Sequence, residues 1–309
     1  MVQKRFNLVS PVTSKETDAK TSSLRNESIE LISKIVSNTN EIQDETIVIK
    51  VSSNIIANEE LLNNFVQNIH LLNSCGANII IVHDYSGLIG NALESMGLQE
   101  KLINGSNVAD FRMSQIIEMA VSGYINKKLV AALCAENCNA IGISGKDANL
   151  IEARKVQITQ SRKIDEVIDI GFIGEPILIN PEVLVSFEEA NLVTVISPIA
   201  FSKTKATYLL DVDMTASILA SAMTAKHLIL MSKCNVIKIE NPAMETISIS
   251  EAIKLSNREL YKEVSSTLKA GVNASENGLE NIYIIDEEDK NALLYSIFLQ
   301  KNRIKFSGN

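Results

Sequence analysis

Lys50 stands out as a charged residue in an apolar setting. It lies in the stretch IVIKVSSNII (47–56), whose β-branched residues predict a buried strand. A buried ammonium without a partner is costly, so Lys50 must reach a partner or solvent. Lysine ammonium groups bind phosphate or pair with carboxylates, and the sequence favours neither role over the other. Two serines, Ser52 and Ser53, follow directly.

The cysteines and histidines form no recognisable set of metal ligands. Cys134 and Cys138 are spaced i, i+4 in LVAALCAENC, a pattern that favours buried apolar residues over a metal site or a disulfide. His70, His83 and His227 are scattered and complete no ligand pattern. The sequence therefore predicts no metal site, and this cysteine usage indicates a reduced, cytoplasmic location.

The elements around Lys50 alternate between short β-branched runs and longer helical segments. Strands are predicted at residues 46–51, 78–83, 139–144, 192–197, 228–232 and 281–286, and the main helices within 58–76, 110–137 and 214–227. This alternation predicts an α/β fold, a three-layer α/β/α sandwich with a mainly parallel open sheet. Ligands bind beyond the carboxyl ends of the strands in such folds, so Lys50 is expected to point into the crevice.

The composition is that of a globular, acidic protein. The 309 residues are 46% hydrophobic and 21% charged, with a formal net charge of −8. This balance argues against nucleic acid and anionic membranes as partners. No apolar run approaches the roughly 20 residues that span a bilayer, and residues 1–20 lack the apolar core of a signal peptide.

Five stretches occur in an order that is typical of one family. They are SGYINKKLVAAL (122–133), IGISGKDANLIEARK (141–155), DIGFIGEP (169–176), VISPI (195–199) and NALLYSIF (291–298). Over residues 45–306 the chain resembles the N-acetylglutamate kinases, within the amino-acid kinase superfamily. The resemblance implies ATP-dependent phosphorylation of the side-chain carboxylate of N-acetyl-L-glutamate, a step of arginine biosynthesis, with Mg·ATP as the phosphoryl donor.

The resemblance also implies a division of the chain. Residues 1–44 correspond to an N-terminal arm and helix, and residues 45–309 to the kinase domain. The acceptor-binding half of that domain spans 45–195 and the nucleotide-binding half spans 196–309. A helix predicted over 24–36 resembles the N-terminal helix of hexameric members. A homo-oligomer is therefore expected, either a dimer or a hexamer built through this helix.

Two charged positions of the family are kept. Its members use a lysine on the first strand to hold the transferring phosphoryl group, and an aspartate to organise that lysine and a second one. The first lysine matches Lys50 and the aspartate matches Asp213 in YLLDVD. On the residues alone, the two could equally form a residual ion pair, and Asp213 could equally cap a helix. SGKD favours a structural turn, in which Lys146 and Asp147 bond to the backbone or to each other.

The phosphate-binding turns depart from the family. Its members place paired glycines after the first strand and a glycine triplet after the second, because bare backbone N–H groups approach the phosphates there. Here the pair is Ser52 and Ser53, and the triplet is Asp84, Tyr85 and Ser86. Asp84 would place a carboxylate where phosphate and acceptor already concentrate negative charge.

The acceptor-binding and second-lysine positions depart as well. The family's arginine corresponds to Asn107, and its two asparagines correspond to Leu209 and Asp211. The second lysine aligns with Thr267, and the nearby lysines at 262 and 269 are out of register. Losing these groups together is expected to lower the rate by roughly four orders of magnitude or more. Binding of Mg·ATP is therefore an open point for this chain.

Two further sites differ. The turn associated with nucleotide binding is SKCN (232–235), one residue shorter than in the family. Arginine-inhibited members bind arginine with a histidine, a glutamate and a glycine, which here are Asn291, Ser296 and Asn302. Feedback inhibition by arginine is therefore not expected.

Three functions remain open on the sequence. The first is a folded homologue with weak or absent kinase activity and a binding or scaffolding role. The second is a working acetylglutamate kinase in which Lys262, Lys269 or serine hydroxyls compensate. The third is a kinase for another small acceptor, with Asp84, Tyr85 and Asn107 in a new pocket. Nucleotide binding separates the first from the others, and acceptor choice separates the second from the third.

Overall fold

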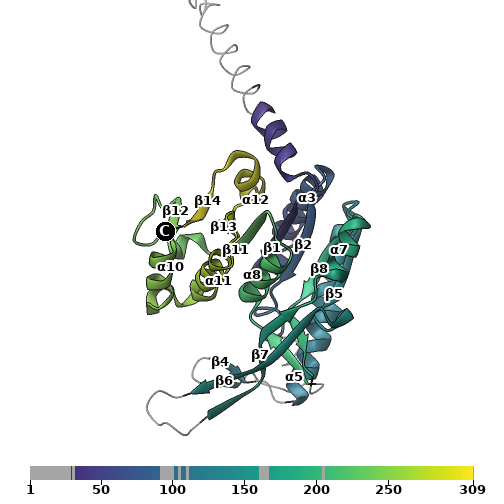
Figure 1. Ribbon diagram of the computed structural model, residues 1–309, viewed down its shortest axis with the longest axis vertical. Coiled ribbons are helices and arrows are strands. Elements are labelled where there is room, and N and C mark those ends of the chain that lie inside the picture. The colour runs from purple at the N-terminus through teal and green to yellow at the C-terminus, as the bar shows by residue number, and fades with distance from the viewer. Residues whose placement is uncertain are drawn as a thin grey trace, which may run out of the picture.

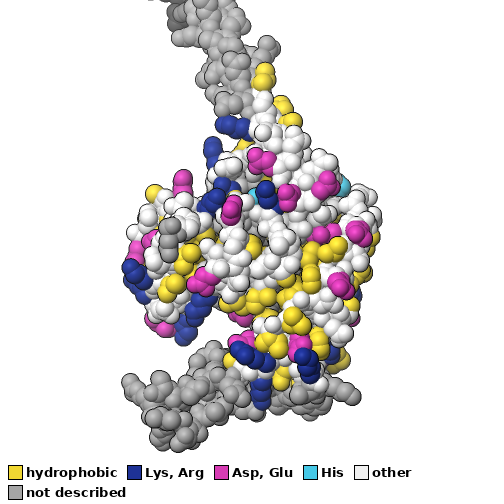
Figure 2. Space-filling view, viewed as in Figure 1, with side chains coloured by type: hydrophobic (Ala, Val, Ile, Leu, Met, Phe, Trp, Pro, Cys, Tyr) yellow, Lys and Arg dark blue, Asp and Glu magenta, His cyan; other side chains and the backbone are white. Residues whose placement is uncertain are grey.

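The computed structural model describes Ile29 and residues 32–90, 101–103, 106–108, 111–159, 167–203 and 206–308; for 101–113 and 157–172 this covers the backbone only. The arm expected before the helix at 24–36 lies outside the described residues. Residues 32–42 are helical and form the described part of the N-terminal helix, which continues beyond the predicted end at Val36 to the buried Ile42. Ile32 and Val36 are exposed on it, and Figure 2 shows hydrophobic side chains at the surface of this helix. Self-association through this helix stays a prediction.

The centre of the molecule is an eight-stranded sheet with the order β12-β14-β13-β11-β1-β2-β8-β5 (Figure 1). All neighbours pair in parallel except β13 and β14. The six predicted strands are confirmed within one residue. The strands are β1 Thr46–Val51, β2 Asn78–His83, β5 Ala140–Ser144, β8 Val193–Ser197, β11 His227–Ser232, β12 Thr246–Ser248, β13 Ile282–Asp286 and β14 Arg303–Ser307.

Helices cover both faces of this sheet, which confirms the three-layer α/β/α architecture (Figure 1). The first face is covered by α2 Ser53–Ala57, α3 Glu59–Ser74, α5 Phe111–Glu118, the π-helical η1 Met119–Ile125, α6 Asn126–Ala135, α12 Ala292–Leu294 and the π-helical η4 Tyr295–Leu299. The second is covered by α7 Glu182–Glu189, α8 Val212–Ala222, α9 Cys234–Ile237, α10 Ile249–Ser256, the 3-10 helix η3 Glu259–Val264 and α11 Ser265–Glu276. In the part of the chain described, no helix is both long and apolar enough to cross a membrane.

Alternation along β1 sets the direction of the Lys50 side chain. Ile47, Ile49 and Val51 join the core under α3, whereas Val48 joins the core under α8. Since successive strand residues point to opposite faces, Lys50 lies on the α8 side. β1 is paired on both sides, with β2 and β11, so Lys50 is held in the middle of the sheet, one residue before the strand ends.

A small closed barrel that the sequence did not predict lies beside the sheet (Figure 1). It contains β6 Ile151–Thr159, β7 Val167–Ile179, β9 Ile199–Phe201 and β10 Thr207–Leu210. A separate two-stranded ribbon consists of β3 Lys101–Ile103 and β4 Ser106–Val108, and the short 3-10 helix η2 spans Asp147–Asn149.

Candidate functional site

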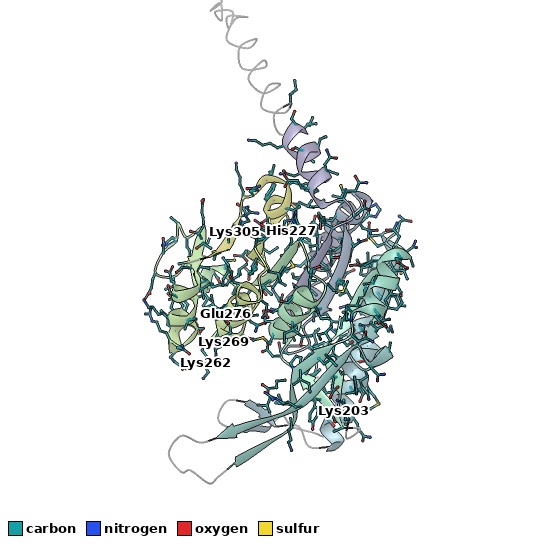
Figure 3. The ribbon with its side chains drawn as sticks, in the orientation of Figure 1. Lys203, His227, Lys262, Lys269, Glu276 and Lys305 are labelled. Atoms are coloured by element: carbon teal, nitrogen blue, oxygen red, sulfur yellow. The ribbon has the colours of Figure 1, made fainter. Side chains whose placement is uncertain are left out.

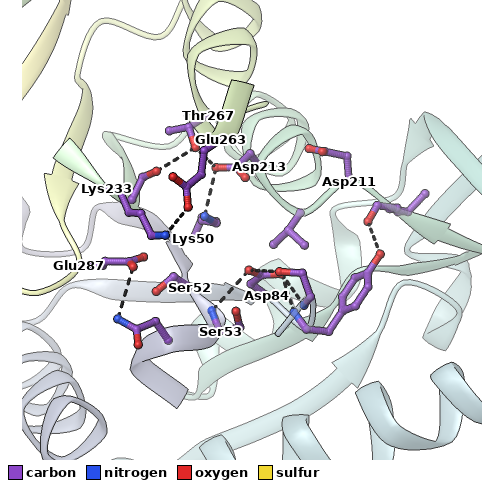
Figure 4. A pocket seen from close by; sticks show the side chains of 16 residues that line it. Lys50, Ser52, Ser53, Asp84, Asp211, Asp213, Lys233, Glu263, Thr267 and Glu287 are labelled. Carbon is purple, nitrogen blue, oxygen red and sulfur yellow. Dashed lines mark hydrogen bonds and ion pairs between the residues drawn. The ribbon is translucent and has the colours of Figure 1, made fainter. Parts of the chain in front are cut away.

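A crevice of about 410 Å³ opens at the carboxyl ends of β1, β2, β11 and β13 (Figure 4). This is the position at which open α/β sheets bind ligands. Its walls bring together most of the residues singled out in the sequence. Those residues are Lys50, Ser52, Ser53, Asp84, Tyr85, Ser86, Asp211, Asp213 and Thr267. Leu209 lies in the neighbouring β10 and does not line the crevice, although Leu210 does.

Lys50 and Asp213 form a buried ion pair at the base of the crevice. The Lys50 Nζ lies 3.4 Å from Asp213 Oδ1 and donates to the Met231 carbonyl at 3.1 Å. Burial alone would lower the pKa of Lys50, but the nearby carboxylates, that of Asp213 first, outweigh it, so the pKa lies above its ordinary value. Burial raises the pKa of Asp213, against the opposing effect of Lys50. The ion pair, one of the roles that the sequence left open for Lys50, is therefore present.

Asp213 is not the cap of the helix that carries it. The N-cap of α8 is Asp211, which has extended backbone angles and accepts a bond from the Met214 N–H at 2.8 Å. The alternative reading of Asp213 as a helix cap is therefore wrong. Asp213 lies in the first turn, where its carboxylate is free to meet Lys50 and Thr267.

Thr267, which the sequence aligns with the family's second lysine, meets this aspartate directly. Its Oγ1 donates to Asp213 Oδ1 at 2.9 Å and lies 3.2 Å from the Ser232 Oγ. Lys262 and Lys269, which the sequence kept as possible substitutes, are exposed and line a separate cavity between α11 and the barrel (Figure 3). Neither lines the crevice, whereas Thr267 does, and the alignment of Thr267 with the second lysine stays a prediction.

Asp84 fills the space between the turns that follow β1 and β2. Its Oδ1 accepts the N–H groups of Tyr85 at 2.6 Å and Ser86 at 2.9 Å, and its Oδ2 accepts the Ser53 N–H at 3.4 Å and the Ser86 hydroxyl at 2.8 Å. Burial would raise the pKa of Asp84, but Lys50 and the bonds to Ser86 and Tyr85 lower it below its ordinary value. An anionic carboxylate of the protein thus occupies a cradle of backbone N–H groups.

Sequence reasoning did not single out four charged or amide side chains of the crevice, which form two pairs. Lys233, in the SKCN turn, pairs with Glu263 of η3, and Asn54 donates to Glu287 Oε1 at 3.4 Å (Figure 4). Lys233 directly follows the last residue of β11, so its place at the carboxyl end of the sheet could have been inferred from the sequence. The Glu263 and Glu287 positions follow only from the folded chain, since they lie 30 and 233 residues from their partners.

Of the positions that the sequence associated with acceptor binding, two are bonded within the chain and one has no described side chain. Asp211 is engaged as the α8 cap and also accepts the Ser266 hydroxyl at 2.6 Å. Tyr85 donates its hydroxyl to the Leu210 carbonyl at 3.3 Å, which ties the β2 turn to β10. Asn107 is in β4, and its side chain lies outside the described part of the structure.

The SGKD segment is a structural turn after β5. Asp147 accepts the Ser144 N–H at 2.7 Å, and Lys146 pairs with Glu118 of α5 at 2.7 Å rather than with Asp147. A Cβ on Gly145 would lie 2.4 Å from the Ile199 carbonyl oxygen, so glycine is needed there for packing. None of these residues lines the crevice.

The three positions aligned with the arginine-binding residues lie close together near the C-terminus. Ser296 is buried, and its carbonyl accepts a bond from Arg303 at 2.7 Å. The Asn302 amide and the Asn291 N–H both donate to Asp289, at 2.9 Å and 3.1 Å. Their polar groups are therefore engaged within the chain.

His83, at the end of β2, makes stability depend on pH. Its ring is fully buried, with Nε2 3.0 Å from the Ser197 Oγ, and burial lowers its pKa from 6.5 to about 4. The unfolded chain therefore binds more protons between those values, and we expect acidification from pH 7 to 4 to remove about 3 kcal/mol of stability through this residue. Urea unfolding across this range measures the loss. Burial also lowers the pKa of His227 to about 4, so His83→Gln should reduce the slope without abolishing it, and an unchanged slope would contradict the assignment.

The same fold occurs in solved structures of kinases and related proteins. Carbamate kinase from Giardia lamblia, bound to AMP-PNP, superposes with a TM-score of 0.55 at 12% identity over 85% of this chain and 99% of that one. N-acetylglutamate synthase from Neisseria gonorrhoeae, complexed with coenzyme A and N-acetyl-glutamate, gives a TM-score of 0.75 at 18% identity over 90% of this chain. The chain spans 63% of the synthase. The class is therefore that of the amino-acid kinase fold.

The sequence comparisons define the family. Residues 45–286 match the Amino acid kinase family, and the chain belongs to it. It is 32% identical over 259 residues to the acetylglutamate kinase of Marinobacter nauticus, covering 82% of this chain and 89% of the relative. The acetylglutamate kinase of Ehrlichia chaffeensis is 32% identical over 260 residues, which cover 82% of this chain and 81% of the relative. The chain is an acetylglutamate kinase-like member of an ATP-binding kinase family.

Proposed function

We propose that this chain is a ligand-binding homologue of acetylglutamate kinase with weak or absent phosphoryl transfer. The observation that carries the proposal is the Asp84 carboxylate, which accepts the backbone N–H groups of Ser53, Tyr85 and Ser86. Such N–H groups are the means by which turns of this kind bind anions. Since Asp84 already engages them, a phosphoryl group would have to displace a carboxylate held within the chain.

The charges of the crevice support the same proposal. Its lining includes two lysines, Lys50 and Lys233, and five carboxylates, those of Asp84, Asp211, Asp213, Glu263 and Glu287. The formal sum is +2 − 5 = −3. Both lysines are already paired, with Asp213 and Glu263. Phosphoryl transfer relies on cations that neutralise the developing charge, and this crevice offers the opposite balance.

Nucleotide binding tests the proposal. We expect Mg·ATP at a few millimolar to leave the melting temperature of the wild-type chain unchanged, because a ligand raises it only where it binds the folded state at such concentrations. Asp84→Gly removes the carboxylate and frees three N–H groups, so Mg·ATP should raise its melting temperature. Thermal unfolding with and without Mg·ATP gives both results.

A matched control is Asp289→Gly, since Asp289 also accepts a backbone N–H in a turn, from Asn291 at 3.1 Å, but does not line the crevice. Its melting temperature should not respond to Mg·ATP. A clear rise for the wild-type chain would overturn the proposal and favour a working kinase.

A further inference from the structure

The crevice contains a second polar group of side chains that phosphoryl transfer does not use. Glu287, after β13, is buried with 6% exposure, and among the described residues no lysine, arginine or histidine nitrogen lies within 4.0 Å of its carboxylate. Its one side-chain hydrogen bond is the long contact of 3.4 Å from the Asn54 amide. Lys50 and Lys233 act on this carboxylate only from beyond 4.0 Å, so no cation of the described residues is in contact with it. A buried carboxylate without a contacting cation is costly, so this position favours a cationic ligand.

Ser52 provides an independent observation at the same wall. It is 5% exposed and lines the crevice, yet its Oγ has no hydrogen-bond partner among the described residues. Figure 4 shows Ser52 and Glu287 on the same side of the crevice, with the Lys50–Asp213 pair beyond them. Buried polar groups are nearly always bonded, so an unpartnered hydroxyl on a residue that lines the crevice points to a missing partner.

We propose that the Ser52–Glu287 wall binds the ammonium group of a small organic amine. An ammonium carries three donors and no acceptor, which suits a crevice lined by both a carboxylate and a hydroxyl oxygen. The net charge of −3 over the crevice lining adds a favourable field for a cation. The volume of about 410 Å³ accommodates a small metabolite.

The side chains favour an amine over a metal ion. Within the described residues, no three histidine, cysteine, aspartate or glutamate side chains are grouped so that they could hold a metal ion. The carboxylate oxygens of Asp84 accept bonds from N–H and O–H donors, and Oδ1 of Asp213 meets both Lys50 and Thr267. Glu287 is thus the one carboxylate of the crevice, as described, with neither a charged partner within 4.0 Å nor a short hydrogen bond.

This inference rests on the proposed function, because a crevice that accepts nucleotide phosphates would not also favour a cation. The probe is 1,4-diaminobutane, titrated into the full-length chain by isothermal calorimetry, with 1,4-butanediol at matched ionic strength as the uncharged counterpart. We expect the diamine to bind and the diol to give no binding heat. Loss of a charged hydrogen bond typically weakens binding about tenfold or more, and Glu287→Gln should do so.

The control variant is Glu276→Gln, the same change at the exposed end of α11 (Figure 3), which should leave diamine binding within about twofold, as expected for a surface charge. Ser52→Ala should weaken binding by a smaller factor. Absence of diamine binding, equal binding of the diol, or full binding by Glu287→Gln would each overturn the amine site. None of these results touches the proposed loss of phosphoryl transfer, which the response to Mg·ATP decides separately.

Discussion

With Mg·ATP and N-acetyl-L-glutamate, the purified chain is expected to form acyl phosphate at least about four orders of magnitude more slowly than an active acetylglutamate kinase. The reason is the joint loss of several groups that act on the same transition state. Thr267 offers a hydroxyl in place of an ammonium, and Asp84 engages the N–H groups that would contact the phosphoryl oxygens. Hydroxylamine trapping of the acyl phosphate measures the rate.

The acetylglutamate kinase of Marinobacter nauticus, 32% identical to this chain, is the positive control in the same assay. Lys50→Ala gives the background, and Asp213→Asn gives a second background at a smaller expected cost in stability. Product above both backgrounds would show that the crevice still transfers phosphoryl groups. In that case Lys233 is the first residue to substitute, because its side chain also lines the crevice.

The sheet followed from the sequence because its strands are short, apolar and β-branched. TIVIKV and NIIIVH are buried on both faces in parallel pairing, and such runs are distinctive in a sequence. The barrel was missed for the opposite reason. β6 and β7 contain charged residues such as Arg154 and Glu175, and they pair with strands of only three and four residues, too short to show a period.

The sequence predicted many of the residues that form the crevice, but not which hydrogen bonds they make. Alignment placed Lys50, Asp213 and Thr267 together, and the hydrogen bonds agree. The sequence could not distinguish Asp211 from Asp213 as the helix cap, since either aspartate suits the position and only the backbone angles decide. It identified Asp84 as a charge conflict but not as a carboxylate that accepts three backbone N–H groups, because those bonds depend on how two separate turns meet.

The glycines show how packing and chemistry diverged in this chain. Gly145 and Gly174 remain where a Cβ would come within 2.4 Å of the Ile199 carbonyl oxygen and 2.6 Å of the Tyr208 Cβ. The turns after β1 and β2 carry serines and an aspartate instead of glycines at the aligned positions. None of these replacements has a positive φ angle, so the fold accommodates them without left-handed strain. Glycines are therefore present where the packing leaves no room for a Cβ, and absent from the aligned positions of the crevice turns.

Lys50→Met is expected to lower the free energy of unfolding by about 3–5 kcal/mol, as is typical when one partner of a buried ion pair is removed. The change leaves Asp213 and Asp84 without the ammonium that both face. Asp213→Asn should cost less, because Asp84 and Glu287 still act on Lys50. Urea unfolding at pH 7 compares the two variants, and equal losses would contradict this asymmetry.

The pH dependence of Lys50→Met identifies the cause of its instability. Burial already raises the pKa of Asp213 while Lys50 opposes that rise, so removing Lys50 raises the pKa further. A carboxyl whose pKa is higher in the folded chain binds more protons there, and its contribution to stability grows as pH falls. The deficit of Lys50→Met relative to the wild-type chain should therefore shrink between pH 7 and 5. A deficit that stays constant would assign the instability to lost packing of the lysine stem instead, and Lys50→Met combined with Asp213→Leu would then recover nothing.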